Sequence, residues 1–125
     1  MRETKAFRVL SDETKMRVLN LLLERECCVC EVMQVLQISQ SKASRVLSTL
    51  YDVGFLKLRK EGLWSLYSVD WDGMTDYLKH ILKATRDAFK NNNQFINDRE
   101  RLRKAERIGP VCVGKIYKSR VSVEA

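Results

Sequence analysis

A mainly α-helical chain with one small β-hairpin is the fold class that this sequence predicts. Residues that break helices are rare, with five glycines and one proline among 125 residues, and a low breaker count favours helix. Apolar side chains recur at helical spacing along much of the chain. Residues 56–69 instead alternate apolar with polar side chains around a turn, as a hairpin does. At this length we expect one domain around a single core.

The first two predicted helices cover residues 4–10 and 13–24. One face of the first helix is expected to hold Ala6, Phe7 and Leu10. Ser11 or Asp12 can then accept free backbone N–H groups at the start of the second helix. Apolar residues recur at spacings of three, four and seven along that second helix, at Met16, Leu19, Leu22 and Leu23.

Two short helices joined by a tight turn come next. They are predicted at residues 29–36 and 40–52, with Ser39 as the N-cap of the second. Such a pair is a helix-turn-helix unit. Its second helix is expected to turn Ala43, Val46, Leu47 and Leu50 inward. Its other face carries polar and basic side chains suited to a DNA major groove: Gln40, Ser41, Lys42, Ser44, Arg45, Ser48 and Thr49.

A basic β-hairpin follows at residues 56–69. Gly54 is the expected residue after the preceding helix, and the hairpin turns at residues 61–62. Arg59 and Lys60 lie near its tip, where they can reach a phosphate or a minor groove. Four helices followed by this hairpin predict a winged helix-turn-helix that binds double-stranded DNA. The formal net charge of +7 agrees with a polyanionic partner.

An amphipathic stretch at residues 71–89 follows a core that is already complete. An apolar stripe in that position usually packs against a partner chain, so the sequence predicts a homodimer. The expected interface residues are Trp71, Met74, Leu78, Ile81, Leu82 and Phe89. Residues 1–90 are thereby predicted to form one DNA-binding and dimerisation domain.

Residues 91–125 are predicted to form a charged C-terminal helix and tail. The helix is expected at residues 95–108, and Gly109 and Pro110 would end it. Its basic run, residues 99–107, is expected to be a solvated face. The tail after it is expected to be extended or mobile, and it carries Cys112.

Three cysteines lie together just before the helix-turn-helix, at Cys27, Cys28 and Cys30. The N-terminus is charged, no export signal follows it, and no apolar run approaches the roughly 18 to 20 residues that cross a membrane. We therefore expect a cytoplasmic protein whose cysteines are thiols or metal ligands rather than disulfides. Thiolates prefer soft ions, and an ion bound here would lie beside the DNA-contacting helix.

Four motifs stand in the order that they have in a known family. They are a long helix at residues 10–22, the cysteine run at 26–32, the Ser-Gln-Ser-Lys-Ala-Ser-Arg-Val-Leu segment at 39–47, and the hairpin residues 60–67. On these motifs the chain resembles the ArsR family of metalloregulatory transcriptional repressors, specifically its arsenic-responsive members, over about residues 5–90. The resemblance implies a homodimer that leaves its operator when As(III) or Sb(III) binds, with no organic cofactor.

The chain departs from that family at two positions near the implied metal site. Met33 stands where well-known members carry another cysteine, and Cys27 stands where they carry leucine. A third thiolate would therefore be Cys27 or the distant Cys112, or be missing. Cys28 and Cys30 are two residues apart, so within a regular helix they would point about 200° away from each other. Capture of one ion by both is expected to distort the start of the following helix.

Other functions fit parts of the sequence. A thiol-redox or persulfide sensor of the same fold would bridge Cys28 and Cys112. A thiol oxidoreductase is an alternative from another class, but the sequence has no Cys-x-x-Cys at a strand-to-helix junction and no glycine-rich phosphate loop, so no enzyme is expected. Asp76 and His80 have the spacing of a zinc site in some family members, but the further histidines that such a site needs are absent.

Overall fold

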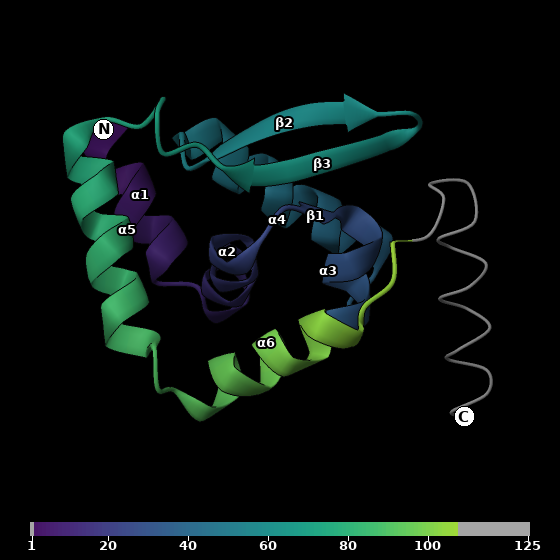
Figure 1. Cartoon of the computed structure of the whole chain (residues 1–125). Coiled ribbons are helices and arrows are strands. Elements are labelled where there is room, and N and C mark those ends of the chain that lie inside the picture. The colour runs from purple at the N-terminus through teal and green to yellow at the C-terminus, as the bar shows by residue number, and fades with distance from the viewer. Residues whose placement is uncertain (1, 108–125) are drawn as a thin grey trace.

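The computed structural model describes residues 2–107, which form a mainly helical winged helix-turn-helix, as the sequence predicts (Figure 1). The helices are α1 (Arg2–Leu10), α2 (Glu13–Glu24), α3 (Val29–Leu36), α4 (Gln40–Val53), α5 (Asp76–Phe89) and α6 (Asn93–Lys104). The strands are β1 (Cys27–Cys28), β2 (Leu56–Glu61) and β3 (Trp64–Val69). Cys112 and the rest of the predicted tail lie outside the described residues. Within residues 2–107, no helix is both long and apolar enough to cross a membrane.

Side-chain caps set the starts of α2 and α4. The Asp12 carboxylate accepts the backbone N–H of Lys15 at 3.0 Å, and the Ser39 hydroxyl accepts that of Lys42 at 3.1 Å. Each bond satisfies one N–H group that the first turn of a helix leaves without a partner. Gly54 ends α4 with φ of 107°, a left-handed conformation that glycine adopts without strain. These boundaries agree with the sequence prediction to within one residue.

The core lies where α2, α3 and α4 meet under the sheet. Its largest fully buried side chains include Leu19, Leu21, Met33, Leu47, Leu50, Phe55 and Leu66. α1 adds Ala6 and Val9, whereas Phe7 is 59% exposed. The expectation that Phe7 faces inward was therefore wrong, because the buried face of α1 follows the three-residue step from Ala6 to Val9.

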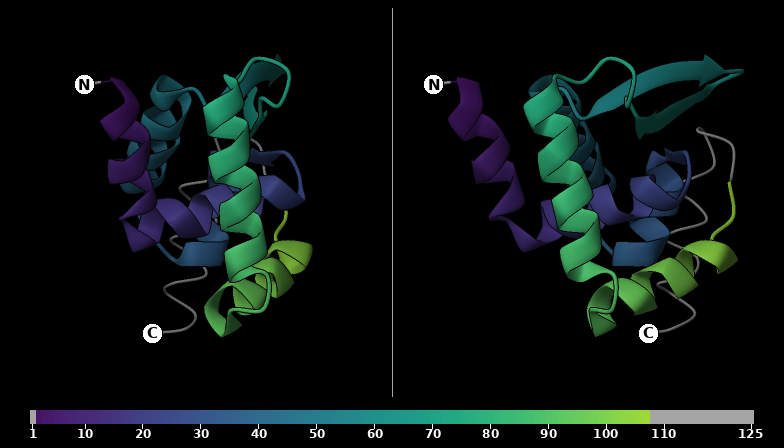
Figure 2. Two further views of the ribbon diagram at one scale, coloured as in Figure 1. Left: turned by 90° about the vertical axis from the view of Figure 1, so that its left-hand side faces the viewer. Right: turned by 60° about the vertical axis from the view of Figure 1, so that its left-hand side comes forward.

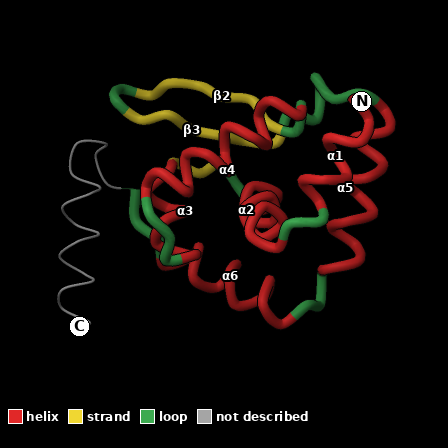
Figure 3. The backbone as a smooth tube through the Cα atoms, turned by 180° about the vertical axis from the view of Figure 1, so that it is seen from behind, coloured by secondary structure: helices red, strands yellow, loops and turns green. Residues whose placement is uncertain are grey.

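The sheet has three strands in the order β1–β3–β2, all antiparallel. β2 and β3 are the predicted hairpin, which projects beyond the helices above α4 (Figure 3). β1 was not predicted. It contains Cys27 and Cys28, which pair with Tyr67 and Leu66 of β3. The cysteine run is thus an edge strand of the wing itself.

α5 begins at Asp76, five residues later than the start of the predicted stretch, so Trp71 and Met74 precede it. Met74, Leu78 and Leu82 are buried within this chain. α5 runs along the outside of the molecule at the same end as α1 (Figures 1 and 2).

α6 crosses beneath α2 and α3 and contacts both (Figure 2). Of the basic run expected to be a solvated face, Arg101, Arg103 and Lys104 are exposed, whereas Arg99 and Arg107 are half-buried. Arg99 donates to the Lys90 carbonyl at 2.7 Å, and Arg101 donates to the Val35 carbonyl at 3.2 Å. Val35 belongs to α3, over which α6 folds back, and Lys90 lies at the end of α5.

Candidate metal centre and nucleic-acid interface

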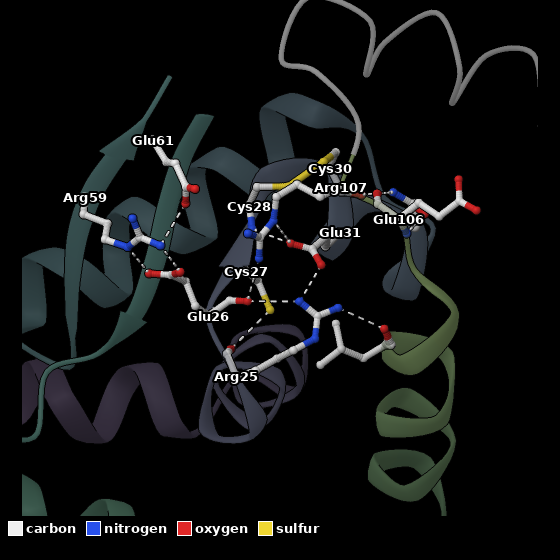
Figure 4. A network of polar contacts seen from close by, with 12 residues as sticks. Arg25, Glu26, Cys27, Cys28, Cys30, Glu31, Arg59, Glu61, Glu106 and Arg107 are labelled. Atoms are coloured by element: carbon white, nitrogen blue, oxygen red, sulfur yellow. Dashed lines mark hydrogen bonds and ion pairs between the residues drawn. A yellow bond between two sulfur atoms is a disulfide. The ribbon is translucent and has the colours of Figure 1, made fainter. Parts of the chain in front are cut away.

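Cys28 and Cys30 bring their sulfur atoms together at the start of α3 (Figure 4). Cys28 is the N-cap residue, with φ of −91° and ψ of 169°, and Cys30 lies in the first helical turn. Their Cα atoms are 5.5 Å apart, and the sulfurs form a disulfide instead of the expected free thiols. Cys28 is extended and lies outside the helix, and the distortion of α3 expected on ion capture stays a prediction. The two sulfurs meet while α3 stays regular.

A buried carboxylate fixes this segment. Glu31 is only 1% exposed, and it accepts the backbone N–H of Cys28 at 3.0 Å. Arg25 pairs with it at 2.5 Å and Arg107 at 3.2 Å. A buried charge is tolerated when it is paired and hydrogen-bonded. Glu31 was not predicted as a site residue, although Cys28-x-x-Glu31 has the spacing of a helix-capping box.

Cys27 faces away from the other two cysteines (Figure 4). Adjacent strand residues point to opposite faces, and the Cys27 thiol donates to the Arg25 carbonyl at 3.4 Å. Burial, helped by the negative charge of Glu31, raises the pKa of Cys27 to about 12. It is therefore protonated and buried, a poor metal ligand. Met33, at the position of the family's other cysteine, is 2% exposed in the core.

Residues 2–107 thus bring together two sulfurs, those of Cys28 and Cys30. Within this range no group of three or more His, Cys, Asp or Glu side chains could hold a metal ion. Cys112, the other sequence candidate for a third thiolate, lies outside the described residues.

A cavity of about 170 Å³ adjoins the sulfur pair. One wall comes from Cys28, Val29 and Cys30, and the others come from Gln40 at the start of α4 and from the turn and first residues of β3 (Leu63, Trp64 and Ser65). A group bound to the two sulfurs would therefore contact both of the elements that the sequence predicts to bind DNA.

The predicted DNA-contacting face of α4 points outward. Gln40, Ser41, Lys42, Arg45 and Ser48 are exposed and Ser44 is half-buried. Their neighbours Ala43, Val46, Leu47 and Leu50 are buried, as predicted. Within residues 2–107 neither Lys42 nor Arg45 forms an ion pair, so both cations are open to phosphate.

The two cations predicted at the wing differ from each other. Lys60 donates to the neutral Ser65 hydroxyl at 2.7 Å. Arg59 instead binds both carboxylate oxygens of Glu26, each at 2.7 Å, and one oxygen of Glu61 at 2.9 Å. This hydrogen bonding from Arg59 lowers the pKa of Glu26. Arg59 is thus engaged within the chain, whereas Lys60 has no acidic partner among residues 2–107.

The predicted dimer residues divide into two groups. Met74, Leu78 and Leu82 belong to the core of their own chain. Trp71, Ile81 and Phe89 are half-buried. The Phe89 ring packs against that of Phe95, with ring centres 5.0 Å apart and the planes tilted by 45°. Exposed aromatic side chains also lie on α1 and α5, at Phe7 and Tyr77.

Comparison with known families and relatives agrees with this geometry. A family model described as "Bacterial regulatory protein, arsR family" matches residues 12–58. A Staphylococcus aureus protein named as a cadmium resistance transcriptional regulatory protein CadC homolog is 41% identical over 91 residues, which cover 72% of this chain and 69% of that protein. The arsenic resistance transcriptional regulator ArsR2 of Pseudomonas putida is 37% identical over 93 residues, covering 74% of this chain and 77% of that protein.

Solved structures share the fold at lower sequence identity. HlyU from Vibrio cholerae has a TM-score of 0.61 at 22% identity, over 72% of this chain and 94% of that one. The homodimeric winged helix-turn-helix domain of a possible ArsR-family regulator from Mycobacterium bovis has a TM-score of 0.60 at 16% identity, over 74% of this chain and 82% of that one.

Proposed function

Because the chain belongs to the arsR family of bacterial regulatory proteins, which are DNA-binding regulators of transcription, we propose that it represses an arsenic-resistance operon. Its inducer is As(III), or the similar ion Sb(III), bound by the thiolates of reduced Cys28 and Cys30. The observation that carries this proposal is the meeting of the two sulfurs beside a cavity shared with α4 and the wing.

A third thiolate from Cys112 completes the proposed site. Arg107, five residues before Cys112 in the sequence, pairs with Glu31 and donates to the Glu26 carbonyl at 3.4 Å. Five residues span at most about 17 Å when fully extended, so the end of the described chain starts within reach of Cys28. Cys27 is the weaker choice because its buried thiol faces the other way.

The operator is bound by the exposed face of α4 and by the wing, in this proposal. Lys42, Arg45 and Lys60 anchor phosphates, while Gln40, Ser41, Ser44 and Ser48 lie where a recognition helix meets base edges. A homodimer would place two such helices on half-sites about one helical turn apart. The proposed partner surface is formed by Ile81 and Phe89 of α5 and by Trp71 before it, the predicted interface residues that the chain's own core leaves partly exposed.

Release of DNA requires the ion to bind the free repressor more tightly than the operator-bound one. A 100-fold loss of operator affinity takes about 2.8 kcal/mol of differential binding, and a complete switch from about 99% bound to about 1% bound takes about 5.5 kcal/mol. Several metal–thiolate bonds can supply a difference of that size. An ion with its ligands in the cavity would lie against Gln40 and Trp64, so its presence affects both DNA-contacting elements at once.

A second candidate inducer is Cd(II), another soft ion. It is favoured by the 41% identity to a relative named as a cadmium resistance regulator. Arsenite and cadmium chloride are therefore compared in the same titrations.

Operator binding by the reduced protein tests this function. The operator is the duplex that the purified protein selects from a random-sequence library, and its affinity is followed by fluorescence anisotropy. Arsenite should weaken wild-type binding by about 100-fold or more. The C28S/C30S variant should bind as tightly as wild type and ignore arsenite, whereas C27A, the matched control, should respond as wild type does. A C28S/C30S protein that arsenite still releases would end the proposal.

A further inference from the structure

We propose that Glu26 and Arg59 are positioning residues that couple the Cys28–Cys30 site to the wing. This inference rests on the proposed function, because it concerns how inducer binding reaches the DNA-contacting surface. Arg59 is then a link within the chain rather than a phosphate anchor. Three observations support this role.

The first observation is the strand register. Cys28 of β1 is paired with Leu66 of β3, and Leu66 is paired in turn with Arg59 of β2. The three residues form one row across the sheet, and Leu66 in the middle is fully buried. A displacement of Cys28 therefore acts on the same row of the sheet that holds Arg59.

The second observation is the ion pair that spans the same sheet. Glu26, one residue before β1, receives two hydrogen bonds of 2.7 Å from the Arg59 guanidinium. Two parallel bonds of this kind fix direction as well as distance. The Nε and Nη2 donors of Arg59 are taken by Glu26 and Glu61, and these two carboxylates beside the cation disfavour a phosphate there (Figure 4).

The third observation connects Glu26 to the sulfur pair through arginines. Arg25 donates to the Glu26 carbonyl at 3.0 Å, and Arg107 also donates to it. The same two arginines pair with Glu31, which accepts the N–H of Cys28. Figure 4 shows this route from the sulfurs through Glu31 and the arginines to Glu26 and then to the wing.

Stability of the fold does not explain the ion pair. The Arg59 side chain is 54% exposed, and exposed ion pairs contribute little to folding because water screens them and ordering their side chains costs entropy. The consequence of the ion pair is that it holds the wing in a fixed position relative to the cysteine run. Movement at the sulfurs then displaces the wing.

The experiment measures operator affinity with and without arsenite, and takes the ratio of the two dissociation constants as the response. E26Q and R59Q should each reduce the wild-type response at least about tenfold. Arsenite binding in the absence of DNA, followed by sulfur–arsenic absorbance, should stay within about twofold of wild type. The E26R/R59E variant moves the cation to the β1 side and should recover most of the response.

K60Q is the matched control, because Lys60 neighbours Arg59 on β2 and does not contact Glu26. It should weaken operator binding equally with and without arsenite, so that its response matches wild type. The coupling inference fails if R59Q keeps the wild-type response as K60Q does, since Arg59 would then be a phosphate anchor. It also fails if E26R/R59E does not recover the response that R59Q loses. The proposed function itself fails if arsenite does not change operator binding by wild type.

Discussion

Two helices of this protein are rich in cations, yet they use them in opposite ways. On α4, Lys42 and Arg45 are exposed and form no ion pair within residues 2–107. On α6, Arg99 and Arg101 donate to acceptors on other parts of the chain. α6 is also held by its own acid, because Asp98 is fully buried in a bidentate pair with Arg17 of α2.

A basic run in a sequence can therefore serve either folding or binding. A cation whose donors are already used within the chain fastens one helix to another. A cation left open on a convex face can instead exchange its counterions for DNA phosphates. Each lysine or arginine raises the net charge equally, whichever helix carries it, so only the positions of the partners separate a structural role from a binding role.

The largest effect is expected on stability, at the buried ion pair that holds α6 against α2. D98N leaves Arg17 without its charged partner, and breaking such a buried pair should lower the free energy of unfolding by about 3 kcal/mol. Urea unfolding followed by circular dichroism measures the change. E100Q is the control, because Glu100 pairs with Arg103 on an exposed surface, and it should shift stability by no more than about 0.5 kcal/mol. Equal effects of D98N and E100Q would mean that α6 is not fastened by this pair.

An intermediate effect is expected on operator affinity, at the exposed cations of α4. K42Q and R45Q should each weaken operator binding by about tenfold and lower the dependence on salt by about one ion. Their thermal unfolding should match wild type, because neither side chain has an ionic partner to lose among residues 2–107. R103Q changes an exposed cation of α6 and should leave operator binding unaltered. If R103Q weakened binding as much as R45Q, the separation of the two helices would be wrong.

The smallest effect at neutral pH is expected on stability, within the cysteine run. There too, one side chain serves the core while its neighbours face a candidate binding site. Cys27 is turned inward, whereas Cys28 and Cys30 line a cavity. Burial keeps Cys27 protonated up to about pH 12, while the same thiol in the unfolded chain ionises at its ordinary pKa near 9. Between these values the unfolded state binds fewer protons, so stability falls as pH rises, by up to about 1.4 kcal/mol per pH unit.

The C27V variant has no thiol to titrate at this position, and it therefore tests whether the Cys27 side chain is buried. Its unfolding free energy should depend less steeply on pH than that of wild type between about pH 9 and pH 12, with little difference at pH 7. Urea unfolding of both proteins across this range gives the two slopes. Identical slopes would show that the Cys27 thiol is not shielded from water.

Local signals in the sequence predicted much of the fold. Asp12, Ser39 and Gly54 mark helix ends through their own backbone neighbours, and the alternation of residues 56–69 predicts the hairpin. Phe7 was misplaced because Ala6 and Val9 already complete the buried face of a short helix. A two-residue strand such as β1 has no period of its own, so its pairing with β3 could not be read from the sequence.

The candidate site was predicted in part, because some of its features depend on local spacing and others on contacts between distant residues. The cysteine cluster, its place before the helix-turn-helix and the outward face of α4 follow from sequence spacing. The start of α3 at Val29 was predicted, but the extended backbone of Cys28, which lets its sulfur meet that of Cys30, was not. The partners of Glu31 and Arg59 come from distant parts of the chain, with Arg107 lying 76 residues after Glu31. Spacing alone cannot locate contacts of that range.

The most direct test is a thermodynamic cycle in which arsenite is titrated into the reduced dimer with and without its operator, and the operator is titrated with and without arsenite. Linkage requires the two ligands to weaken each other by the same factor. We expect that factor to be about 100 or more for wild type and close to one for C28S/C30S. An arsenite-loaded wild-type protein that held its operator as tightly as the empty protein would contradict the account.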